Sequence, residues 1–85
     1  MRLAVTERFA RRYRDLPESL QTRVDTQLEL LLQNPRHPSL RTKKMKGTAG
    51  IWELRVTEGY RLTFEIREDL YLLRNVGTHD ILRNP

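Results

Sequence analysis

The sequence predicts an α+β fold in which two N-terminal antiparallel helices pack on one face of a mainly antiparallel, four-stranded sheet. Three observations predict it: a short β-prone opening, two helical apolar patterns before residue 35, and three strand-like segments after residue 50. The expected element order is β-α-α-β-β-β. At 85 residues, the chain is expected to form a single domain spanning 1–85.

The N-terminal half contains the predicted first strand and both helices. Residues 2–5 (RLAV) form the expected strand, and Thr6 is placed to cap a helix over 7–15. Phe9 and Tyr13, four residues apart, give that helix an apolar face. A second helix is expected to begin at Pro17 and to end before Pro35. Its apolar residues recur at helical spacing: Leu20, Val24, Leu28, Leu31 and Leu32.

The C-terminal half contains the predicted hairpin and the last strand. IWELRV and YRLTFEI alternate between apolar and polar residues, and Thr57, Glu58 and Gly59 form the turn that joins them. The last strand, over 70–76, begins with apolar residues on both faces, which favours a central position in the sheet.

The polar face of the hairpin is the first candidate site. Glu53 and Arg55 on one strand and Arg61 on the next point away from the apolar face, near the turn. Two guanidinium groups within cross-strand reach are suited to clamping one phosphate. The alternative is a solvated face on which Glu53 and Glu65 pair with the arginines.

A histidine and an aspartate follow the last strand. His79 comes two residues after Gly77, where a strand-end histidine is suited to giving a proton to a leaving alkoxide. The alternative is an ordinary surface histidine. Asp80 is expected either to orient the imidazole or to cap a short terminal turn.

The charge distribution indicates a polyanionic or acidic partner. The formal net charge is +5, the pI is near 10.2, and no acidic residue occurs between 36 and 52. Within that segment, four exposed cations are predicted to neutralise a nucleic-acid backbone: Arg41, Lys43, Lys44 and Lys46. Cysteine is absent, and neither metal-ligand spacing nor a phosphate-binding glycine loop is present. No apolar run suggests a membrane span or a signal segment, so we expect a cytoplasmic protein without a cofactor.

Four segments taken together resemble the RelE/ParE superfamily of bacterial toxin–antitoxin toxins: KKMKG, IWELRV, EGYRLTFEI and LLRNVGTHDIL. The resemblance extends over essentially the whole chain and is sharpest between residues 44 and 62. It implies a helix pair on an antiparallel sheet. For the RelE-like branch it also implies metal-independent cleavage of mRNA in the ribosomal A site, by attack of the ribose 2′-hydroxyl on its own phosphate.

The resemblance also implies roles for individual residues. Arg61 stands where those enzymes keep a catalytic arginine, and Arg55 where they keep a basic strand residue. His79 stands where YoeB-like and YafQ-like members have a histidine that acts as general acid. The chain departs from the pattern at Glu53, where RelE has a lysine, and it lacks RelE's C-terminal extension with its tyrosine. The general base is therefore left open between Glu53 and assistance from Asp80.

Two further expectations come from the same resemblance. The partner of such a toxin is a cognate antitoxin with an acidic or amphipathic segment, in addition to mRNA and the ribosome. The competing interpretation is a ParE-like inhibitor of DNA gyrase without catalysis, although ParE-like members generally lack a histidine at the position of His79. A third possibility is an inactive relative.

Overall fold

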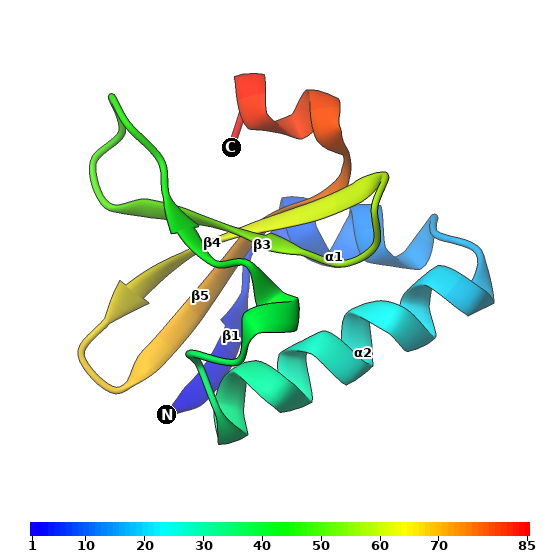
Figure 1. Cartoon of the computed structure of the whole chain (residues 1–85). Helices are drawn as coiled ribbons and strands as arrows, with labels where there is room; N and C mark the ends of the chain where they lie inside the picture. The colour runs from blue at the N-terminus through cyan, green and yellow to red at the C-terminus, as the bar shows by residue number, and fades with distance from the viewer.

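The computed structural model describes residues 1–85 as one five-stranded sheet with two α-helices and two short 3₁₀ helices (Figure 1). In chain order the elements are β1 (Arg2–Val5), α1 (Glu7–Arg14), α2 (Glu18–Gln33), η1 (Pro38–Leu40), β2 (Lys43–Lys44), β3 (Ile51–Arg55), β4 (Tyr60–Arg67), β5 (Leu70–Thr78) and η2 (His79–Arg83). Neither α-helix combines the length and apolar character that a bilayer span requires.

The strand order is β1-β5-β4-β3-β2, and β1 runs parallel to β5 while every other pair is antiparallel. The prediction of four strands was therefore wrong: the sheet has five strands and is mixed. The extra strand, β2, has only two residues, Lys43 and Lys44, and so carries no apolar alternation that would indicate a strand. β5 lies in the interior of the sheet, as its apolar start indicated, because β1 covers one of its edges and β4 the other, although the middle strand of the five is β4.

Both helices begin where the sequence indicated. The Thr6 hydroxyl accepts a hydrogen bond from the Phe9 amide at 3.1 Å, which is the predicted cap of α1. Pro17 precedes the first turn of α2, and Asn34 follows its last residue. Leu32 remains 40% exposed, whereas the polar Gln27 is buried.

The core lies between the helix pair and one face of the sheet. Phe9 of α1 and three residues of α2 meet the inward side chains of β3, β4 and β5, and Leu40 closes the end near η1. Trp52 and Phe64 stack at 6.4 Å between ring centroids, and Tyr71 meets Phe64 edge-on at 5.5 Å. The buried apolar set is Phe9, Val24, Leu28, Leu31, Leu40, Leu54, Val56, Leu62, Phe64, Tyr71, Leu73 and Val76.

A β-bulge interrupts the pairing of β4 with β5. Phe64 lies opposite Leu73, but its neighbour Thr63 lies opposite Asn75, so Arg74 is an extra residue on β5. The bulge inverts the alternation of side chains beyond it. Val76 therefore joins the core, whereas Asn75 turns to the polar face opposite Thr63.

The end of the chain folds back over this polar face. The Thr63 hydroxyl donates to the Pro85 carbonyl oxygen at 3.1 Å, and the Asn75 amide donates to the Asn84 carbonyl at 3.1 Å. Ile81 of η2 is buried against Gly77. In Figure 1 the red C-terminal turn accordingly lies on the side of the sheet away from α2.

We expect Gly77→Ala to destabilise the protein, because a Cβ at residue 77 would lie 2.8 Å from Cγ2 of the buried Ile81. Overpacking of this kind costs about 1–3 kcal/mol, measurable by urea unfolding. Gly59→Ala is the matched control, since a Cβ there meets no atom within 4 Å. Equal stability of the two variants would show that η2 does not pack firmly on Gly77.

Candidate active site

Arg55 and Arg61 lie directly opposite each other on β3 and β4, as the sequence predicted. Both are half-buried. The Arg61 Nη1 donates to three carbonyl oxygens of the hairpin, those of Thr57, Glu58 and Tyr60, at 2.7, 3.0 and 3.0 Å. These contacts hold the guanidinium at the turn and leave its Nε and Nη2 groups available to a ligand.

The two arginines have no carboxylate partner within the chain. The three ion pairs are Arg2–Asp69, Arg67–Glu65 and Arg74–Glu65. The alternative interpretation, in which Glu53 and Glu65 pair with these two arginines, is therefore wrong: Glu65 pairs with Arg67 and Arg74 instead, and Glu53 with no cation. Two uncompensated arginines at directly paired strand positions favour a bound anion.

Glu53 shares the face of the arginine pair. It lies two residues before Arg55 on β3, opposite Thr63 of β4 and Lys43 of β2. Its side chain forms no ion pair with any cation of the chain. A carboxylate thus lies two residues from Arg55, on the same strand and the same face.

His79 and Asp80 begin η2 immediately after β5. Gly77 pairs with Arg61, so His79 comes two residues beyond the strand position next to that arginine. His79 is exposed and its ring makes no hydrogen bond within the chain, to Asp80 or to any other residue. Asp80 lies in the first turn of η2, where Thr78 rather than Asp80 occupies the capping position. The roles of both residues remain predictions.

The C-terminal segment closes the other half of the polar face. Thr63 is 0% exposed beneath it, so the open part of the face is the end near the hairpin, where Glu53, Arg55 and Arg61 lie. No pattern in the sequence predicted this cover.

Arg8 and Arg74 hold the cover in place. The Arg8 Nη2 donates to the Pro85 oxygen at 2.7 Å, and the Arg74 Nε donates to the same oxygen at 3.2 Å. Burial, followed by the nearby charge of Arg74, lowers the pKa of Arg8 from its ordinary value.

The predicted basic segment lies along the sheet edge next to β3. Arg41 ends η1 in the left-handed region (φ 46°), Lys43 and Lys44 form β2, and Lys46 lies in the following turn. All four are exposed and none forms an ion pair. They extend the positive surface from the arginine pair across β2.

Sequence reasoning missed Arg23 of α2. It lines a groove of about 400 Å³ together with Arg41 and Arg55. The one signal that pointed to it is the lack of any carboxylate three or four residues away on the helix, which leaves its charge without a local partner.

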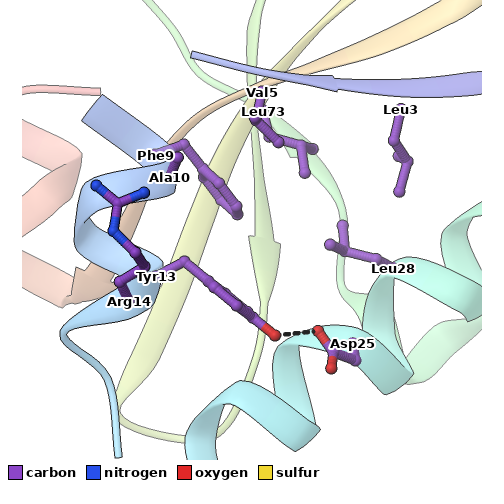
Figure 2. A pocket seen from close by; sticks show the side chains of 9 residues that line it. All are labelled: Leu3, Val5, Phe9, Ala10, Tyr13, Arg14, Asp25, Leu28 and Leu73. Carbon is purple, nitrogen blue, oxygen red and sulfur yellow. Dashed lines mark hydrogen bonds between the residues drawn. The ribbon is translucent and has the colours of Figure 1, made fainter. Parts of the chain in front are cut away.

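A second groove, of about 310 Å³, is apolar and lies beside the edge strand β1 (Figure 2). Leu3 and Val5 are 38% and 52% exposed there. The Tyr13 hydroxyl donates to Asp25 at 2.7 Å across the groove, and this hydrogen bond raises the pKa of Tyr13. No cluster of three or more His, Cys, Asp or Glu side chains that could hold a metal ion occurs in the chain.

The fold and site together define a small basic α+β protein with an uncompensated arginine pair at one end of its sheet. No protein-family model and no curated protein matches the sequence. Solved structures do match. YafQ from E. coli BL21(DE3) superposes with a TM-score of 0.80 at 15% identity over 96% of this chain and 98% of that one. The YoeB/ParE toxin from Agrobacterium tumefaciens superposes with a TM-score of 0.80 at 16% identity, over 93% of this chain and 99% of the matched one.

A third similar structure is the intact E. coli RelBE toxin–antitoxin complex, with a TM-score of 0.73 at 21% identity over 91% of this chain and 94% of the matched one. The chain therefore has the fold of the RelE, YoeB and YafQ toxins. The resemblance seen in the sequence is confirmed at the level of the fold.

We expect Glu65→Gln to weaken the dependence of the free energy of unfolding on pH in the acidic range. Burial alone raises the pKa of Glu65, but hydrogen bonds from Arg74 and Arg67 outweigh it and hold the pKa below its ordinary value. The pKa of Glu65 is therefore lower in the folded protein than in the unfolded chain. Ionised Glu65 adds its full contribution to the free energy of unfolding above about pH 4.3, the ordinary pKa of glutamate in an unfolded chain. This contribution is lost as pH falls through the folded value.

The measurement is urea unfolding at a series of pH values from about 6 to about 3. The wild type should lose stability more steeply than Glu65→Gln. Glu68→Gln is the matched control, since Glu68 is exposed and forms no ion pair. An equal dependence on pH in the acidic range for wild type and Glu65→Gln would contradict the assignment.

Proposed function

We propose that the chain is the toxin of a toxin–antitoxin pair and acts as a metal-independent endoribonuclease on mRNA at the ribosome. The observation that carries the proposal is the cross-strand pair of Arg55 and Arg61, which has no carboxylate partner and lies beside the end of β5, directly before His79. The fold shared with RelE, YoeB and YafQ toxins supports the same class of function.

The proposed reaction needs a general base, stabilisation of negative charge and a general acid. A base takes the proton of the ribose 2′-hydroxyl, and the 2′-oxygen attacks the adjacent phosphorus. The phosphorane carries extra negative charge, which Arg55 and Arg61 stabilise. His79 then protonates the departing 5′-oxygen. The products are a 2′,3′-cyclic phosphate and a 5′-hydroxyl, and no water or metal enters the balance.

Glu53 is the better placed of the two candidate bases. It lies on the face of the arginine pair, one pleat from Arg55, whereas Asp80 lies beyond the strand in η2. Glu53 is half-buried and pairs with Lys43 of β2, so it lies next to the basic segment proposed to bind the RNA backbone, which consists of Arg41, Lys43, Lys44 and Lys46.

A cognate antitoxin is the proposed protein partner. The RelE structure similar to this chain is part of a RelBE toxin–antitoxin complex. A net charge of +5 on 85 residues favours an acidic segment in the partner.

We expect Arg61→Ala to slow cleavage by about 10²–10³-fold, because a donor aimed at developing oxyanion charge contributes a few kcal/mol. The assay is primer extension on a translated message with purified ribosomes. Arg61→Lys keeps the charge and should recover part of the rate. Arg12→Ala, an exposed arginine of α1, is the control. If Arg61→Ala cuts as fast as wild type, the phosphate clamp is wrong.

We expect His79→Gln to abolish growth arrest and message cleavage in cells while the fold is retained. Glutamine keeps hydrogen-bonding capacity but gives up no proton near neutral pH. His37→Gln is the matched control, because the other histidine lies outside this site and accepts from the Ser39 amide. An intact message together with a DNA-damage response would move the protein to gyrase inhibition, and neither effect would indicate an inactive relative.

A further inference from the structure

The polar groove lined by Arg23, Arg41 and Arg55 lies between three segments that are distant in sequence: α2, the residues after η1, and the end of β3 with its hairpin. Its volume of about 400 Å³ accommodates a nucleotide-sized group. The groove is distinct from the apolar groove of Figure 2, which contains none of these arginines.

The wall of the groove is built from the open edge of β3. β2 pairs only with Trp52 and Glu53, so the later part of β3 has no strand on the edge opposite β4. Two side chains of α2 take the place of the missing strand. Gln27 donates to the Arg55 carbonyl at 2.8 Å, and Arg23 donates to the Val56 carbonyl at 3.3 Å.

This arrangement satisfies the edge carbonyls and explains why Gln27 is buried. It also fixes Arg23 beside the strand. One of its Nη atoms is engaged, while its remaining N–H groups have no partner in the chain. The side chain is thus oriented by the fold rather than free in solvent.

The groove has an uncompensated positive charge. Its three guanidinium groups face one carboxylate, that of Glu58, and none of them forms an ion pair with it or with any other acid. Spaced guanidinium forks with few acceptors suit a phosphate oxygen rather than a base edge, so the expected contact does not depend on sequence.

The groove is continuous with the candidate active site through one residue. Arg55 belongs both to the cross-strand pair with Arg61 and to the groove lining. A strand of RNA whose phosphate lies at that pair therefore has an adjacent positive pocket on the α2 side. We propose that this groove binds the phosphate of a nucleotide neighbouring the cleaved linkage, an inference that rests on the proposed function for the identity of its ligand.

The test measures binding without cleavage. The probe is a short single-stranded RNA that is fully 2′-O-methylated, so no 2′-hydroxyl can attack. Its dissociation constant is measured by fluorescence anisotropy at several salt concentrations. Arg23→Gln and Arg41→Gln should each weaken binding by about fivefold to tenfold at low salt and reduce the slope of log K against log salt by about 0.7, the value for one phosphate contact on a single strand.

Two further variants separate charge from structure. Arg12→Gln removes one positive charge from an exposed position of α1 that lines no groove, and should leave the slope unchanged. Arg23→Lys keeps the charge and should restore most of the slope. Should Arg23→Gln fail to fold, Arg41→Gln carries the test, because the Arg41 side chain makes no hydrogen bond within the chain.

The outcomes separate this inference from the proposed function. If Arg23→Gln and Arg41→Gln bind as Arg12→Gln does, or if the wild type does not bind the probe, the groove is not a phosphate site. Cleavage of unmodified message by the wild type would leave the proposed function standing in that case. Groove-dependent binding with no cleavage would support the groove and reject the ribonuclease.

Discussion

The β-bulge at Arg74 determines how both faces of the sheet are used. The Arg74 carbonyl oxygen accepts hydrogen bonds from the Thr6 hydroxyl and from the Arg8 Nε, both at 3.1 Å, and Thr6 is the cap of α1. Its guanidinium donates to Glu65 and to Pro85. One extra residue thus connects α1, β4 and the end of the chain to β5.

The bulge also separates the closed and open parts of the polar face. By turning Asn75 and Gly77 outward, it creates the surface on which η2 and the last residues pack. The polar face over β5 is therefore occupied by the chain itself. What remains open is the hairpin end, where Arg55 and Arg61 form no ion pair with Glu53 or any other acid. Unpaired positive charge costs stability through repulsion and is useful where an anion binds.

Much of the fold was predictable from the sequence, because it depends on interactions between residues close together in the chain. The cap at Thr6, the limits of α2, the hairpin turn and the pairing of Arg55 with Arg61 follow from periodicity and turn chemistry. The bulge has one sign in the sequence: Leu73 and Val76 are both apolar and three residues apart, so a regular strand would point them to opposite faces, whereas both belong to one core. The fifth strand and the groove at Arg23 depend on tertiary contacts of residues with no distinctive pattern, such as Gln27 with the Arg55 carbonyl.

The candidate active site combines one fixed group with two adjustable ones. Arg61 is held by three hairpin carbonyls, whereas the Arg55 side chain and the His79 ring make no hydrogen bond within the chain. Catalysis requires the reacting groups to be oriented together, and orienting free side chains has an entropic cost that the substrate complex must offset. In the proposed reaction, Arg61 therefore serves as the anchor for the phosphate. In that proposal the placing of His79 depends on what holds the RNA. This is a physical reason to expect that the proposed reaction requires the ribosome, because an RNA strand held rigidly by a larger particle orders the groups that this small chain leaves free.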